Sequence, residues 1–120
     1  MARGTTILAL IAVGFVTASS NAASASEERM GMGAGMLTCA EWKQNRSDDN
    51  FIAFQLEAWV DGFLTGYNVG SYSIDFIPQR NDSVAYYAWI DNYCSHNPLN
   101  QIVEATIALK SELIFRAKPH

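Results

Sequence analysis

Hydrophobic side chains recur along the chain at intervals of three and four residues, which is the spacing of amphipathic helices. The longest pattern consists of Ile52, Leu56, Trp59, Val60, Phe63, Leu64 and Tyr67. A later one consists of Leu99, Ile102, Val103, Thr106, Leu109 and Leu113. No alternating run of strand length is bounded by turn residues. The pattern therefore predicts an all-α fold.

Capping residues predict where the first two helices begin and end. Thr38 and Glu41 have the spacing of a capping box, so the first helix should start there and run to about Arg46. Residues 47–50 (Ser-Asp-Asp-Asn) should end it and cap the second helix, which carries the longest hydrophobic pattern.

Two further helices are expected after a long loop. The third should start near Asp82 or Ser83, run to Cys94 and carry aromatic residues on most of its sides. Asn97-Pro98 has the residue types that cap and open a helix, so the fourth helix should begin there. The prediction is thus a small four-helix domain.

The loop between the second and third helices spans about residues 70–82 and is unusually apolar. Its apolar side chains are Tyr72, Ile74, Phe76 and Ile77. Loops of this length without regular structure are often functional. These side chains should either cover the core or face a partner, and we favour the core because the domain is small.

Two pairs of residues on the second helix suggest special roles. Gly62 and Gly66 lie four residues apart on one side of it, and glycine in a helix costs about 1 kcal/mol relative to alanine. We therefore expect close packing of another backbone there, or a ligand that needs room. Glu57 and Asp61 have the same spacing and are expected along a solvated edge.

The first 25 residues have the features of a secretory signal peptide. Arg3 is the only charge before Glu27, and an apolar run over residues 7–18 is too short to span a bilayer. The small residues that follow allow cleavage after Ala25 or Ala22, and no later segment could span a membrane. We expect a periplasmic protein with a flexible Gly/Met-rich linker at 26–37, one helical domain at 38–116 and a tail at 117–120.

Composition and charge narrow the range of partners. The chain has 12 acidic and 8 basic residues, a net charge of −4 and 49% hydrophobic residues. An acidic chain argues against nucleic acid as a partner. The three methionines at positions 30, 32 and 36 have neither His nor Cys among them, so we expect no copper site there.

Cys39 and Cys94 are the only cysteines, so if they pair they form a single disulfide. A disulfide is the expected state of two cysteines outside the cytoplasm. Closing the loop between positions 39 and 94 would contribute about 4 kcal/mol in the chain-entropy model.

Catalytic and metal motifs are not evident. His96 has Ser95 and Asp91 nearby in the sequence, but no nucleophile-elbow motif accompanies them, and His120 is the last residue. Neither a phosphate loop nor a paired metal motif occurs. We therefore expect no enzyme activity, no cofactor and no metal.

Two short motifs resemble the HdeA/HdeB group of small periplasmic proteins. They are the runs Thr38–Trp42 (Thr-Cys-Ala-Glu-Trp) and Tyr93–Leu99 (Tyr-Cys-Ser-His-Asn-Pro-Leu). That group consists of four-helix, single-disulfide, ATP-independent chaperones that protect clients during acid stress. The resemblance covers roughly residues 38–113 and implies the same fold, the periplasm and the binding of unfolded clients.

A third motif resembles a different group. The run Trp59–Tyr67, which contains Gly62 and Gly66, is similar to the Tai-type immunity proteins. Those proteins bind and block cell-wall amidases delivered by type VI secretion. This resemblance implies one specific enzyme as the partner, bound at neutral pH.

Protein binding is therefore the expected function. The candidate binding residues are Trp59, Phe63, Tyr67, Tyr72, Ile74, Phe76, Ile77, Tyr86 and Trp89. An acid-stress chaperone is our first hypothesis; an inhibitor of a cell-wall hydrolase and a structural subunit of the envelope are the alternatives. The client, the trigger and the choice between monomer and homodimer stay open.

Overall fold

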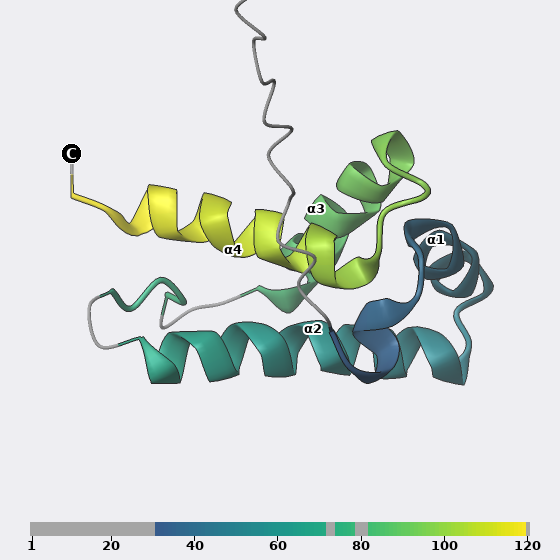
Figure 1. Ribbon diagram of the computed structural model, residues 1–120, viewed down its shortest axis with the longest axis horizontal. Coiled ribbons are helices and arrows are strands. Elements are labelled where there is room, and N and C mark those ends of the chain that lie inside the picture. The colour runs from purple at the N-terminus through teal and green to yellow at the C-terminus, as the bar shows by residue number, and fades with distance from the viewer. Residues whose placement is uncertain (1–30, 72–73, 79–81, 120) are drawn as a thin grey trace, which may run out of the picture.

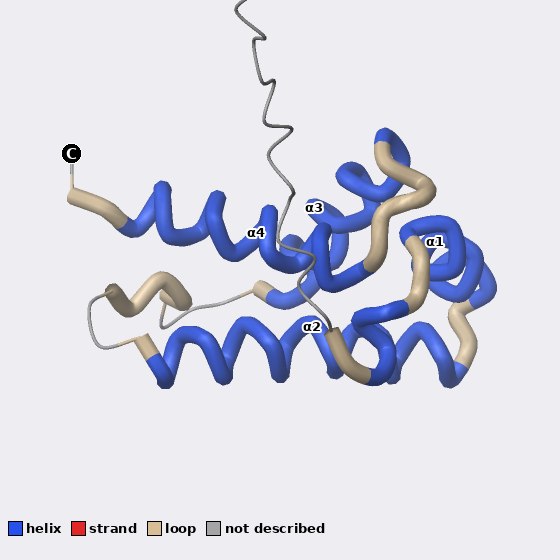
Figure 2. The backbone as a smooth tube through the Cα atoms, in the orientation of Figure 1, coloured by secondary structure: helices blue, strands red, loops and turns tan. Residues whose placement is uncertain are grey.

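A computed structural model of the chain describes residues 31–71, 74–78 and 82–119 (Figure 1). The elements are a 3-10 helix η1 (Gly33–Met36) and the α-helices α1 (Cys39–Asp48), α2 (Phe51–Gly70), α3 (Ser83–His96) and α4 (Ile102–Ala117). Within these ranges there is no strand, so the all-α four-helix prediction is confirmed (Figure 2). The predicted signal peptide, Tyr72 and His120 lie outside the described residues.

The disulfide joins the first turn of α1 to the end of α3. Cys39 and Cys94 are bonded with an S–S distance of 2.04 Å, as predicted. Both cysteines are fully buried, and so is Trp42 one turn along α1. The disulfide and the indole of Trp42 therefore form the centre of the α1–α3 contact.

The buried stripe of α2 differs from the predicted one. Its buried residues are Ala53, Leu56, Val60 and Leu64, whereas Ile52 and Tyr67 are each 45% exposed. The aromatic Trp59 and Phe63 lie at the edge of this stripe, half-buried. The helix is therefore rotated so that aliphatic residues face the core and aromatic residues flank it.

The start of α4 was predicted wrongly. Asn97-Pro98 does not open the helix; α4 begins at Ile102, after Gln101, which forms a capping box with Glu104. The reason is that the backbone of the turn at 97–100 forms hydrogen bonds with the start of α1 instead. The carbonyls of Asn100 and Pro98 accept hydrogen bonds from the amides of Cys39, at 2.7 Å, and Ala40, at 3.1 Å.

The helix ends also run further than expected. Thr38 and Glu41 do form the predicted capping box, but α1 continues to Asp48 and ends at Asp49, whose φ of 47° is left-handed. Similarly, α3 continues past Cys94 to His96.

Part of the expected flexible linker is a packed element. Residues 33–36 form η1, and Trp59 on α2 donates from Nε1 to the carbonyl of Met32 at 2.9 Å. Gly35 is buried beneath the same indole, where a Cβ atom would lie 2.1 Å from Trp59 Cζ2. Within the expected linker, residues 33–36 are therefore held against α2 by an aromatic residue.

Gly62 and Gly66 pack closely against none of the residues that the structure describes. Among these, a Cβ atom added at either position would meet no heavy atom within 4 Å. The described residues therefore supply no close contact at these two positions, whereas Gly35 does lie in one. Gly62 and Gly66 instead lie on the exposed side of α2.

The loop after α2 does cover the core. Phe76 is only 3% exposed, and Ile74 and Ile77 pack against the buried cluster. Asn68 on α2 holds this loop, because its Oδ1 accepts from the amide of Phe76 at 2.8 Å and from that of Ile77 at 3.3 Å. The core interpretation is thus confirmed for these three apolar residues.

Candidate functional site

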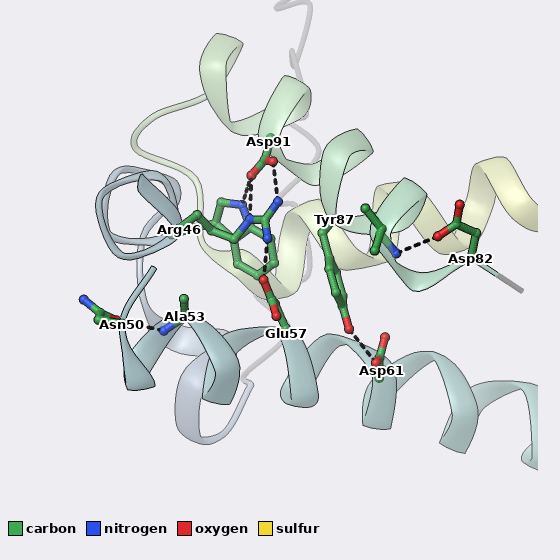
Figure 3. A network of polar contacts seen from close by, with 10 residues as sticks. Arg46, Asn50, Ala53, Glu57, Asp61, Asp82, Tyr87 and Asp91 are labelled. Carbon is green, nitrogen blue, oxygen red and sulfur yellow. Dashed lines mark hydrogen bonds and ion pairs between the residues drawn. The ribbon is translucent and has the colours of Figure 1, made fainter. Parts of the chain in front are cut away.

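Arg46 on α1 joins three helices in one network (Figure 3). Its Nε and Nη2 atoms donate to the two carboxylate oxygens of Asp91 on α3, at 3.1 and 2.8 Å. Its Nη1 atom donates to the carboxylate of Glu57 on α2. The planar fork of a guanidinium matches the geometry of carboxylates, so one side chain can bind both partners.

Aromatic rings surround this guanidinium. The Arg46 Cζ atom lies 5.6 Å from the ring centroid of Trp42 and 5.5 Å from that of Tyr87, within the range of cation–π attraction. The indole Nε1 of Trp42 also donates to Asp91 Oδ1 at 2.7 Å. The ion pair is therefore half-sheltered from water.

The network fixes the charge state of its members. Hydrogen bonding to Asp91 raises the pKa of Arg46 above its ordinary value, although burial opposes it. Burial alone would raise the pKa of Asp91, but hydrogen bonds from Arg46 and Trp42 outweigh it, so the pKa is lowered. At neutral pH both groups are ionised.

A second polar contact joins α2 to α3. The hydroxyl of Tyr87 donates to Asp61 Oδ2 at 2.6 Å. Burial, together with this hydrogen bond and the charge of Asp61, raises the pKa of Tyr87 to about 12. The phenol is therefore neutral at all ordinary pH values and is held as a hydrogen-bond donor.

These contacts correct the expectation for Glu57 and Asp61. The two carboxylates lie one turn apart on α2, but both are half-buried and face α1 and α3 rather than solvent. They are also the only charged side chains between Phe51 and Gly70. All the charge of α2 is therefore used in contacts with neighbouring helices.

The candidate aromatic residues of α2 lie along one edge of it. Trp59 and Phe63 stack with ring centroids 5.5 Å apart. Tyr67 lies further along, with Lys110 Nζ of α4 at 4.1 Å from its ring centroid and Phe76 at 6.1 Å. In this folded state the three rings are partly covered by neighbouring elements.

The other candidate residues divide into two places. Phe76 and Tyr86 line an open cavity of about 500 Å³ between the loop at 74–78, the start of α3 and the end of α4. Leu113 and Arg116 of α4 line it as well. Trp89 does not line this cavity and stacks on Tyr93 at 5.8 Å. The candidate residues that the structure describes thus do not all lie on one surface.

Several exposed apolar residues were not predicted as candidates. Phe51 is 72% exposed, Phe54 65% and Val69 76%, all on α2. They lie on the side of the helix opposite its buried stripe, and the sequence marks that side by the absence of any charged residue. A helical projection of residues 51–70 would have found this pattern.

The residues near His96 do not form a catalytic arrangement. His96 Nδ1 lies 2.9 Å from the carbonyl of Asn92, and Ser95 Oγ donates to the carbonyl of Asp91 at 2.8 Å. The carboxylate of Asp91 is bound to Arg46 instead. Across residues 31–71, 74–78 and 82–119, no group of three or more His, Cys, Asp or Glu residues could hold a metal ion.

Comparison of the chain with protein-family models, curated proteins and solved structures finds no match. None of the helices in the described part of the chain has the length and apolar character needed to cross a bilayer. Any functional conclusion therefore depends on the residues and contacts themselves.

Proposed function

We propose that this chain is an exported, ATP-independent chaperone that holds unfolded proteins when its surroundings become acidic. The observation that carries the proposal is that Glu57 and Asp61 attach α2 to its neighbouring helices. These two carboxylates provide all the charge on α2, and both bind residues of α1 or α3. Acid removes charge from carboxylates, so it weakens the attachment of α2 in particular.

Protonation changes the balance of charge around Arg46. Once Glu57 and Asp91 are neutral, the half-buried guanidinium keeps its charge but loses both ionic partners, which is costly. Over the whole chain, neutralising 12 acidic residues leaves the 8 basic residues and adds net positive charge. Self-repulsion then favours a more open state.

The disulfide determines which part opens. Cys39–Cys94 keeps α1 and α3 together whatever the pH, because a disulfide does not titrate in this range. Release of α2 would then uncover its buried stripe and the stacked rings of Trp59 and Phe63. This surface suits the apolar segments of unfolded clients.

Export is part of the same proposal. The features of residues 1–25 fit a signal peptide, and a disulfide between the only two cysteines is compatible with an oxidising compartment such as the periplasm. Binding rather than catalysis is the activity that the contacts support.

The test is an aggregation assay on the disulfide-bonded chain purified from the periplasm. A client enzyme that unfolds at pH 2–3 is acidified and returned to neutral pH while its light scattering is followed. We expect the chain to suppress aggregation at about equimolar amounts and to bind the dye ANS as the pH falls. Unchanged client aggregation at pH 2–3 would contradict the proposal.

A pair of variants tests whether client binding is triggered by protonation of Glu57 and Asp61 in particular or of any carboxylates. Glu57→Gln with Asp61→Asn imitates the protonated carboxylates, so the onset of client binding should move to higher pH. Glu112→Gln with Asp48→Asn is the matched control, because these exposed carboxylates only contact residues of their own helices. The control should keep the wild-type onset.

A second candidate, an immunity-type inhibitor of a cell-wall hydrolase, is favoured by one observation. Gly62 and Gly66 leave open space on the exposed side of α2 in the folded protein. Such a module would bind its enzyme at neutral pH with no change in shape. Stoichiometric inhibition of a purified cell-wall amidase at pH 7, together with no chaperone activity in acid, would favour this candidate over the first.

A further inference from the structure

The open cavity of about 500 Å³ has no part in the proposed chaperone mechanism. It lies between the loop at 74–78, the start of α3 and the end of α4, and we call it the loop cavity. In Figure 1 this loop lies between the ends of α2 and α4. Sites for small molecules typically have volumes of about 300–1,000 Å³, apolar walls and a few polar groups at fixed positions. The loop cavity therefore has the size of such a site.

The walls of the loop cavity are mainly apolar and are held in place. Phe76 is only 3% exposed, Leu113 is 8% exposed and Tyr86 is half-buried. The side chain of Asn68 on α2 accepts a hydrogen bond from the Phe76 amide, so the loop wall is anchored to a helix. An aromatic or aliphatic group in the cavity would therefore contact carbon atoms from the loop, from α3 and from α4.

Two carboxylates line the same cavity. Asp75 Oδ1 accepts from Asn68 Nδ2 at 2.8 Å, and Asp82 Oδ1 accepts from the amide of Val84 at 3.1 Å. Both aspartates are exposed, and the second oxygen of each forms no hydrogen bond with the described residues. A carboxylate can accept several hydrogen bonds, so each aspartate can also bind a donor that a ligand brings.

Negative charge is in excess around the loop cavity. Arg116 is the only basic residue among the described lining residues, and its Nε already donates to Glu112 within α4 at 2.6 Å. The two aspartates of the cavity form no ion pair with the described residues. Burial raises the pKa of the Tyr86 phenol, and the charges of Asp61 and Asp82 raise it further. Negative charge therefore acts on a ring of the cavity wall.

We propose that the loop cavity binds a small organic cation, which consists of a protonated amine and an aromatic or aliphatic body. The body packs between Phe76, Tyr86 and Leu113, and the ammonium group donates to Asp75 and Asp82. The faces of aromatic rings also attract a nearby cation. An anion of the same shape would meet two carboxylates and a guanidinium that is already paired. Charge thus makes an amine the ligand that the cavity fits.

Phenethylamine is the probe, because it has a phenyl body and is protonated at pH 7. In two-dimensional NMR of the disulfide-bonded chain, the amide signals of Phe76, Ala85 and Ala117 should shift and saturate, with a dissociation constant on the order of 0.1–1 mM. Phenethyl alcohol and phenylacetate have the same ring without the positive charge and should bind about fivefold more weakly. An amine that shifts no cavity signal up to about 10 mM, or phenylacetate that binds as tightly, would overturn the proposal.

Asp75→Asn with Asp82→Asn tests the two carboxylates. Asparagine keeps an acceptor for Asn68 and is a favoured helix cap at position 82, so the fold should persist while the charge is lost. Affinity for phenethylamine should fall about 5–20-fold, and affinity for the alcohol should change less than about twofold. Asp48→Asn with Asp49→Asn removes the same charge at exposed positions outside the cavity and should bind the amine like the wild type. Unchanged amine affinity in the folded variant at 75 and 82 would overturn the proposal.

Filling the cavity tests where the amine binds. Ala85 is exposed and lines the loop cavity, so Ala85→Phe should occupy it and remove binding. Ala88→Phe is the matched control, because Ala88 is exposed on the same helix but does not line the cavity. Circular dichroism shows whether each variant is folded. Binding that persists in folded Ala85→Phe would overturn the proposal. Client protection in acid is measured separately, so failure here does not decide the proposed function.

Discussion

The hydroxyl of Tyr87 on α3 donates to the carboxylate of Asp61 on α2 at 2.6 Å. This contact lies beside the Arg46 network, so α2 is attached to α3 by a phenol–carboxylate bond and to α1 by an ion pair. The two attachments depend on pH in different ways. The carboxylates lose charge in acid, whereas the phenol loses its proton in alkali.

Replacing Tyr87 by phenylalanine should lower stability and remove a sensitivity to alkali. The raised pKa of about 12 means that the folded state holds the phenol proton more tightly than the unfolded state does. The stabilisation is therefore complete below the unfolded pKa, near 10, and is lost as the pH rises towards 12. In urea unfolding, the free energy of unfolding of Tyr87→Phe at pH 7 should be about 1 kcal/mol below that of the wild type. Above pH 10 the variant should lose less additional stability than the wild type does.

Tyr93→Phe is the control for that experiment. The Tyr93 hydroxyl accepts a hydrogen bond from Asn100 rather than donating to a carboxylate. Tyr93→Phe should therefore lose as much stability above pH 10 as the wild type does. An identical alkaline slope in wild type and Tyr87→Phe would show that the contact with Asp61 does not hold the phenol proton.

Replacing Asp91 by asparagine should make stability less dependent on acid. The pKa of Asp91 is lowered in the folded chain, so its contribution is complete above the ordinary aspartate value, near 4, and is lost as the pH falls below it. Asp91→Asn should be less stable than the wild type at pH 7 by about 1–2 kcal/mol. The difference should shrink towards pH 2 in urea unfolding followed by circular dichroism.

Glu112→Gln removes a carboxylate whose ion pair, with Arg116, lies within α4. It should change stability at pH 7 by less than about 0.5 kcal/mol, as exposed helix pairs generally do. If it flattened the acid dependence as much as Asp91→Asn, the network around Arg46 would not be the acid-sensitive contact.

The helices could be predicted from the sequence because their signals are local. The capping box of Thr38 and Glu41 lies within three residues, and the structure contains it. The cap at Asn97-Pro98 failed because that turn gives its carbonyls to the amides of α1, about 60 residues earlier in the chain. A local motif therefore gave a wrong helix start where a distant segment uses the same backbone.

The site was harder to predict because its contacts connect distant residues. Arg46 meets Glu57 and Asp91, which lie 11 and 45 positions away in the sequence. No spacing rule links residues on three different helices. Similarly, the role of Gly35 depends on the indole of Trp59, whereas the packing indicated by the spacing of Gly62 and Gly66 is not found among the described residues.

Two glycine substitutions should therefore have opposite effects. Gly35→Ala places a Cβ atom 2.1 Å from the Trp59 ring, so η1 or the indole must move, at a cost of about 1–3 kcal/mol. Gly62→Ala meets open space and improves helix propensity, which should stabilise the folded chain by about 0.5–1 kcal/mol. Thermal unfolding at low protein concentration measures both shifts; equal shifts for the two variants would contradict the assigned packing.

Removing the disulfide should cost the most stability of any change considered. Cys39 and Cys94 are fully buried and lie 55 positions apart, so their bond restricts a large part of the unfolded chain. Cys39→Ala with Cys94→Ala should lower the free energy of unfolding by about 2–5 kcal/mol at pH 7, measured in urea. Reducing the wild type should lower it similarly, which serves as the control for the cavity left by the two sulfur atoms. A loss below about 1 kcal/mol would mean that the polar network and the buried Trp42 hold α1 to α3 without the bond.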